Sequence, residues 1–88
     1  MPRYIIERTT GTLTRDQLDA AGRKSNEVLA QMPGVVWVRS YISDVEGKIY
    51  CEYDAPDEAA VRRHAELAGL PVDKISLVAL EVSPSMFV

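Results

Sequence analysis

The chain has 88 residues, the length of one small domain. Hydrophobic residues make up 47% of the chain and charged residues 26%, which is typical of a folded globular domain and excludes a disordered chain. Ten basic and thirteen acidic residues give a net charge of −3, so we expect no nucleic-acid partner. No apolar run approaches the ~20 residues that cross a bilayer, and the first residues lack a signal-peptide pattern. We therefore expect a cytoplasmic protein with no membrane contact.

Residues 3–9 are rich in β-branched and aromatic side chains and predict a first strand. Thr14 and Gln17 have the spacing of a capping box, so a helix is expected to begin after Thr14. Pro33-Gly34 ends this helix. Its inward stripe is Leu18, Ala21, Ser25, Val28, Leu29 and Met32.

Two further strands follow as a hairpin, over residues 35–42 and 48–53, with a polar turn between them. Asp57 is the expected N-cap of a second helix, and Gly69 is the glycine expected at its end. The last main strand is expected over residues 75–80.

This β-α-β-β-α-β order predicts the α+β, ferredoxin-like fold, in which two helices cover one face of an antiparallel sheet. The right-handed crossover rule leaves few other arrangements of these elements. We expect a single ferredoxin-like domain over residues 1–88. Residues 83–88 form a C-terminal tail that either adds an edge strand or is exchanged with a partner.

The face of the sheet without helices is expected to form an interface. Strict alternation along the second strand places Val35, Trp37, Arg39 and Tyr41 on one face and the smaller Val36, Val38, Ser40 and Ile42 on the other. The smaller set suits packing under helices, so we expect Trp37 and Tyr41 on the open face beside Tyr50 and Glu52. An exposed aromatic patch signals an interface, which predicts a symmetric homodimer. The alternative is that Trp37 packs under a loop.

Cys51 and His64 are the only cysteine and the only histidine, and both are expected on the helix side of the sheet. A thiolate and an imidazole are good ligands for nickel, zinc or copper, and they also suit a Cys–His nucleophile pair. The alternative is structural: Cys51 packs as a small hydrophobe and His64 as a core residue. Ala60 and Ala68 stand one helical turn from His64, so this helix offers no second ligand.

Glu7 and Arg8 lie in the expected first strand, and one of them faces the helices or an interface. That residue needs a partner, because an unpaired buried charge is costly. Glu7 is therefore a candidate third metal ligand or a general base. The alternative is an ion pair of Glu7 with Arg39 or Lys48.

Five segments resemble a small bacterial family of nickel-binding proteins, formerly a domain of unknown function. They are Tyr4–Arg8, Val36–Tyr41, Lys48–Asp57, Val61–Ala65 and Ala68–Pro71. The resemblance covers residues 3–82. It implies a ferredoxin-like homodimer that binds nickel ions and stores or buffers them, with His64, Cys51 and Glu7 at positions able to bind the metal.

We therefore expect a non-enzymatic, homodimeric nickel-binding protein, whose ligand types also suit copper and zinc. One alternative is a small-molecule enzyme or binder of the dimeric α+β-barrel type. Its pocket would lie between sheet and helices, lined by Tyr41, Glu7, His64 and Cys51, with His64 or Glu7 as acid or base. A cavity of roughly 300 Å³ or more would favour that alternative. A further alternative is an accessory subunit of a larger enzyme.

Overall fold

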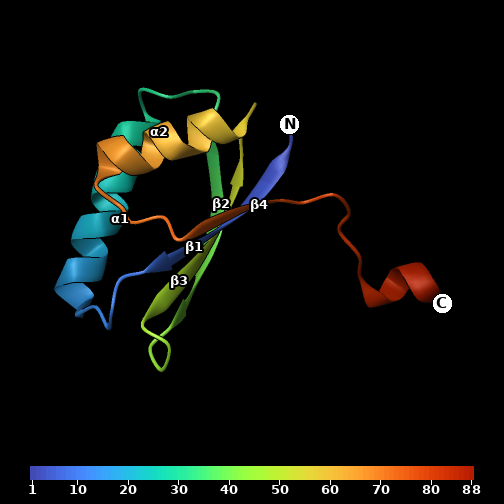
Figure 1. Cartoon of the computed structure of the whole chain (residues 1–88), viewed down its shortest axis with the longest axis horizontal. Helices are drawn as coiled ribbons and strands as arrows, with labels where there is room; N and C mark the ends of the chain where they lie inside the picture. Colours follow the sequence, from blue (N-terminus) through green and yellow to red (C-terminus); the bar gives the residue numbers. More distant parts are fainter.

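The computed structural model describes all 88 residues as one four-stranded sheet with two helices on one of its faces (Figure 1). The elements are β1 (Arg3–Thr9), α1 (Arg15–Leu29), β2 (Val36–Ser43), β3 (Lys48–Asp54), α2 (Glu58–Ala68), β4 (Lys74–Leu77) and the short 3-10 helix η1 (Pro84–Phe87). The strands are all antiparallel, in the order β2-β3-β1-β4. The predicted α+β, ferredoxin-like fold is confirmed.

Local hydrogen bonds set the ends of both helices. Gln17 N donates to Thr14 Oγ1 at 3.1 Å, and Thr14 N donates to Gln17 Oε1 at 2.9 Å, which completes the capping box before α1. Ala60 N donates to Asp57 Oδ1 at 2.8 Å before α2. Gly69 ends α2 with φ +69°, a left-handed conformation that glycine adopts without steric cost. The predicted caps are confirmed.

The core lies between the sheet and the helices. The inward side chains of the two central strands are Tyr4, Ile6 and Arg8 of β1 and Ile49, Cys51 and Tyr53 of β3. The apolar members of this set pack with Val61 of α2, and Ala65 of α2 is buried as well. Three polar residues, Arg8, Ser25 and His64, are buried in this largely apolar layer. A polar side chain in such a place needs partners, which makes this layer the first place to look for a site.

Strand β2 contains a β-bulge that reverses the expected faces of its first residues. Trp37 is opposite Tyr53, but Arg39 is opposite Glu52, so Val38 has no partner of its own. Paired residues share a face, which puts Trp37 on the helix side and Arg39 on the open face. The prediction of Trp37 on the open face is wrong, because strict alternation ignores the extra residue.

Beyond the bulge the expected faces are correct, with Tyr41 opposite Tyr50 on the open face. Before the bulge they are inverted. Val36 is opposite Asp54 on the open face, whereas Val35 is buried in the core. The open face therefore holds one large aromatic residue of β2, Tyr41, instead of two.

Strand β4 is shorter than the predicted 75–80. It pairs with β1 from Lys74 to Leu77, and Val78 N adds one more bond to Arg3 O at 2.9 Å. Because β1 begins at Arg3, the chain beyond Val78 has no strand to pair with. The tail runs away from the sheet and ends in η1 (Figure 1). Neither helix has the length and hydropathy needed to cross a membrane.

Candidate functional site

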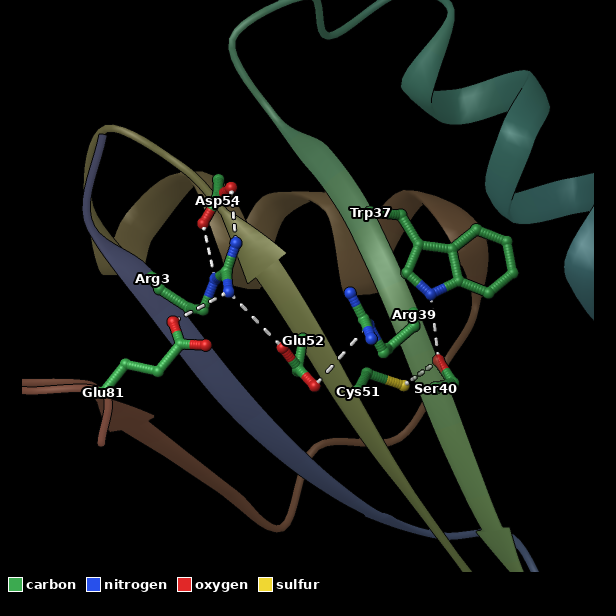
Figure 2. Close-up of polar contacts among 8 residues, drawn as sticks. All are labelled: Arg3, Trp37, Arg39, Ser40, Cys51, Glu52, Asp54 and Glu81. Carbon is green, nitrogen blue, oxygen red and sulfur yellow. Dashed lines mark hydrogen bonds and ion pairs between the residues drawn. The ribbon is translucent and has the colours of Figure 1, made fainter. Parts of the chain in front are cut away.

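Cys51 is the acceptor at the centre of a small polar cluster on the helix side of the sheet. Trp37 Nε1 donates to Ser40 Oγ at 2.9 Å, and Ser40 Oγ donates to Cys51 Sγ at 3.0 Å (Figure 2). Arg8 Nε approaches the same sulfur at 3.5 Å. The Cys51 thiol therefore has protein donors on two sides. Cys51 is 4% exposed, so the thiol has little contact with solvent.

Arg8 is a buried cation without a carboxylate partner. It is 1% exposed, and none of the ion pairs of the chain includes it. Its Nη1 donates to Pro71 O at 2.9 Å, and its Cζ lies 5.8 Å from the centre of the Tyr53 ring. Its Nη2 is buried and has no hydrogen-bond partner. Of Glu7 and Arg8, Arg8 is therefore the residue that faces the helices.

His64 is fully buried and neutral. Its Nε2 lies 3.1 Å from Ser25 Oγ of α1, and its ring centre lies 5.1 Å from that of Tyr53. Burial, and then the positive charge of Arg8, lower the pKa of His64 from its ordinary value of 6.5. Its Nδ1 is buried without a hydrogen-bond partner. Burial also raises the pKa of the Tyr53 phenol, so both rings are uncharged at neutral pH.

Glu7 lies on the opposite face of the sheet from the other two candidate ligands. It is opposite Tyr50 on the open face, and its Oε1 is 3.7 Å from Lys48 Nζ. Cys51 and His64 do share the helix side, as the sequence predicted, but no hydrogen bond joins them. A single chain therefore does not bring His64, Cys51 and Glu7 together.

The arrangement within one chain does not fit a metal ion. No group of three or more His, Cys, Asp or Glu side chains is placed to hold one. Arg8 donates toward Cys51 Sγ and lowers the pKa of His64, so its positive charge would also repel a cation between these two residues. Additional ligands would have to come from a second copy of the chain.

A cavity of about 60 Å³ lies beside the cluster, between α1 and the sheet. The residues around it include Arg8, Ser25, Ser40, Cys51, Tyr53 and Trp37, but almost all of the surface that faces the cavity is apolar. This volume is about a fifth of the roughly 300 Å³ at the lower end of small-molecule pockets. This cavity is therefore too small for the pocket that the α+β-barrel alternative requires. A wider surface groove shares Trp37 and Ser40 with the cavity.

The open face carries a network of ion pairs. Arg3 binds Asp54 with two hydrogen bonds, Nε to Oδ1 at 3.0 Å and Nη2 to Oδ2 at 3.2 Å (Figure 2). The hydrogen bond from Arg3 lowers the pKa of Asp54. Arg3 also contacts Glu81, two residues before the tail, at 3.3 Å, and Glu52 lies between Arg3 and Arg39, at 3.7 and 3.9 Å. This network ties the segment that leads into the tail to the sheet.

Sequence reasoning did not assign Arg8, Ser25, Ser40 or Trp37 to the site. One of them had a readable signal: Ser25 is the single polar residue in the apolar stripe of α1. A hydroxyl at such a position needs an inward partner, which proves to be His64. Ser40 was correctly expected on the helix side, but nothing in the sequence marked it as a partner of Cys51. Trp37 had no such signal, because its side depends on the bulge.

The fold and this cluster define the class: a ferredoxin-like α+β protein with buried polar groups between its sheet and helices. A family model described as "Nickel responsive protein SCO4226-like" matches residues 4–78. The chain therefore belongs to the SCO4226-like family, and the resemblance seen in the sequence is confirmed.

A solved structure agrees with this assignment. The chain is similar to the crystal structure of SCO4226 from Streptomyces coelicolor A3(2), with 27% sequence identity and a TM-score of 0.79. The match covers 91% of this chain and 99% of that chain. A comparison with curated proteins finds no match.

Proposed function

We propose that this chain is a non-enzymatic, cytoplasmic protein that binds nickel ions as a homodimer and stores or buffers them. The observation that carries the proposal is membership of a nickel responsive family over residues 4–78. Cys51 and His64, the only thiol and the only imidazole, are the ligands that nickel would prefer in this chain.

The state of His64 supports its role as a ligand. A metal binds the neutral imidazole, and burial keeps this ring neutral by lowering its pKa. Nδ1 makes no hydrogen bond within the chain, so coordination there would break none. Cys51 is the other proposed ligand on the helix side, whereas Glu7, on the opposite face of the sheet, is proposed to bind nickel at a separate position on the open face.

A homodimer would supply ligands that one chain lacks. A two-fold interface presents the same residue twice, so an open-face contact would bring two copies of Glu7 toward the same axis. Tyr41, 54% exposed, and Val36 give the open face apolar surface for such a contact. Leu80 after β4 and Phe87 of the tail are also exposed and suit burial against a partner.

Isothermal titration calorimetry of the tag-free protein with nickel tests the proposal. We expect saturable heat, a dimer by light scattering, and weaker binding in the variants His64→Ala, Cys51→Ala and Glu7→Gln. Glu58→Gln is the matched control for Glu7, because Glu58 is an exposed helix residue paired only with Arg62. Copper should bind more tightly than nickel, as the Irving–Williams order requires, and zinc should also bind because thiolate and imidazole suit it.

The outcomes separate binding from the choice of ligands. Absence of heat at high micromolar nickel would refute nickel binding. Normal affinity in all three ligand variants would refute the assignment of His64, Cys51 and Glu7 while leaving nickel binding in place.

A further inference from the structure

We propose that residues 80–88 form an apolar arm that docks at the cavity between α1 and the sheet of a second copy of the chain, so that two copies exchange arms. This inference rests on the homodimer of the proposed function, to which it adds a contact. It involves neither nickel nor the proposed metal ligands.

The first argument is the surface of the arm. Five of the twelve exposed large hydrophobic side chains of the chain lie in these nine residues, with exposed fractions from 55% to 109%. No charged side chain follows Glu81 within the arm. An apolar patch of this kind, gathered in one short segment, marks a surface that binds another protein surface. Its members are Leu80, Val82, Met86, Phe87 and Val88.

The second argument is that the arm is separate from the family fold and has a local structure of its own. The family model matches residues 4–78, so the arm lies outside the matched part. Within it, Met86 N donates to Ser83 O at 3.0 Å, and Ser83 N donates to Met86 Sδ at 3.4 Å. These bonds form the turn of η1 before any partner is met, which lowers the conformational entropy that docking costs.

The third argument is the cavity, which is apolar and matches the end of the arm in size. Almost all of the surface that faces it is apolar, and its walls include Leu18, Ala21 and Ile49. A water-sized site takes roughly 10–15 Å³, so a cavity of about 60 Å³ holds roughly four to six non-hydrogen atoms. The side chain of Met86 has four. Its flexible thioether also suits contact with the aromatic ring of Trp37, which lines the same cavity.

The surface next to the cavity has room for the rest of the arm. A groove of about 570 Å³ adjoins the cavity and shares Leu18, Trp37 and Ser40 with it. Phe87 is too large to enter the cavity together with Met86, and we place its ring in this groove beside the indole.

The positions of arm and cavity favour a second copy over the same chain. The cavity lies under α1 and above β2 and β3, whereas the arm leaves from β4 at the other edge of the sheet. The ion pair of Arg3 with Glu81 holds the start of the arm on the open face, and the arm then runs away from the helices (Figure 1). The sheet therefore stands between the arm and the cavity of its own chain, while a second copy can present its cavity directly.

The area agrees with a stable dimer. Burial of one large apolar side chain removes roughly 60–120 Å² from water, so five of them remove roughly 300–600 Å² per arm. The receiving surface loses a similar area, and a symmetric pair has two such contacts. The exchange therefore buries roughly 1,200–2,400 Å², which covers the range of specific protein–protein interfaces.

Dilution of the full chain tests the docking, because Trp37 is the only tryptophan and lies at the docking site. Light scattering and Trp37 fluorescence are measured in metal-free buffer from about 1 to about 500 μM chain. We expect both signals to change over the same concentration range, since separation of the dimer removes the arm from the indole.

Met86→Ser and Phe87→Ser remove apolar side chains from the arm and leave its backbone in place. Each should raise the dimer Kd at least about a hundredfold, because one buried side chain is worth about tenfold or more and the dimer has two arms. Val45→Ser is the matched control. Val45 is 101% exposed in the turn between β2 and β3, outside both the arm and the cavity.

Ala21→Met tests the receiving side, because it fills the cavity from α1 and leaves the arm unchanged. It should also weaken the dimer at least about tenfold. An equimolar mixture of Ala21→Met and Met86→Ser should recover part of the dimer. The first variant keeps an intact arm and the second an open cavity, so a mixed pair regains one of the two contacts. A variant that is merely less stable would not be rescued in this way.

Four results would overturn the inference. They are a parent-like dimer in both arm variants or in a folded Ala21→Met, equal weakening by Val45→Ser, Trp37 fluorescence that stays constant while the dimer separates, and a monomeric parent. A monomeric parent whose arm binds phosphatidylcholine vesicles would assign the arm to a lipid surface instead. If Ala21→Met does not fold, the two arm variants and the fluorescence decide the question.

The failures are distinguishable. A dimer that persists in the arm variants refutes the docking and leaves the homodimer in place, whereas a monomeric parent refutes both. Nickel binding is decided separately, by the heat of titration.

Discussion

Acidifying the metal-free protein from about pH 7.5 to about pH 5.5 is expected to lower its free energy of unfolding through His64. This residue is fully buried, and burial followed by the charge of Arg8 lowers its pKa from the ordinary 6.5. The unfolded chain therefore takes up a proton at higher pH than the folded chain does. The contribution of the neutral imidazole to the free energy of unfolding is fully present well above pH 6.5. It declines as the pH falls through 6.5 toward the folded-state pKa.

The size of this effect has an upper limit set by linkage. A histidine that stays neutral in the folded state and has an unfolded pKa of 6.5 loses about 1.4 kcal/mol at a pH one unit below that value. Partial protonation of the folded state reduces the loss. In a domain of this size, the full loss corresponds to a fall in Tm of roughly 6–11 °C.

Urea unfolding, followed by Trp37 fluorescence at four pH values, measures this decline directly. His64 is the only histidine, so no other imidazole contributes. The pKa of Asp54 is lowered by its hydrogen bond with Arg3, so this carboxylate titrates below the range used. The control is His64→Gln, which keeps an amide able to bond Ser25 but does not titrate.

A parent protein that kept its stability, or gained stability, as the pH fell from about 7.5 to about 5.5 would refute this role of His64. It would also be refuted if His64→Gln showed the same decline as the parent. In that case the pH dependence would belong to groups other than the buried imidazole.

Two matched pairs of substitutions, measured by urea unfolding, test the packing. Ile6→Ala should cost about 2–5 kcal/mol because Ile6 is 0% exposed, whereas Ile5→Ala on the half-buried open face should cost less than half as much. Equal costs would contradict the assignment of faces in β1. Gly22→Ala should stabilise by about 0.5–1 kcal/mol, since an added Cβ meets nothing within 4 Å in α1. Gly69→Ala should destabilise by about 1–2 kcal/mol because its φ is +69°, and two effects of the same sign would refute this account.

The helices could be predicted from sequence because their end signals are local. Thr14 and Gln17 are three residues apart, and so are Asp57 and Ala60. Gly69 needs only its own left-handed φ. Each signal acts within one helical turn, so it does not depend on contacts with distant parts of the chain. The order of the elements then limited the fold to few topologies.

The candidate site was predicted only in part. The face on which a strand residue lies depends on the number of residues that precede it in the strand, so one extra residue reverses the assignment. Cys51 and His64 were correctly placed on the helix side. In β1, however, each face carries apolar and charged residues, with Ile6 and Arg8 on one side and Ile5 and Glu7 on the other. The pattern alone does not say which charge is buried, and the partners that decide it come from β3 and from the segment before β4, more than forty residues away in sequence.

The length of β4 and the ion pairs of the open face could not be predicted from the local sequence either. Both depend on partners that are distant along the chain. β4 ends where β1 begins, so its last residue is set by Arg3 and not by the strand's own sequence. The bond between Arg3 and Asp54 joins residues 51 apart in the chain. Such contacts exist only after the sheet has its register, and no local pattern encodes that register.

The bulge at Val38 connects the fold to the cavity. In a regular strand, residues three apart point to opposite faces. Trp37 and Ser40 are three apart, yet Trp37 Nε1 donates to Ser40 Oγ at 2.9 Å, because the extra residue returns both side chains to the helix side. Ser40 then reaches Cys51 Sγ, and the indole lines the cavity that also contains Arg8. The irregularity that made the prediction for Trp37 wrong is thus the feature that assembles this polar cluster.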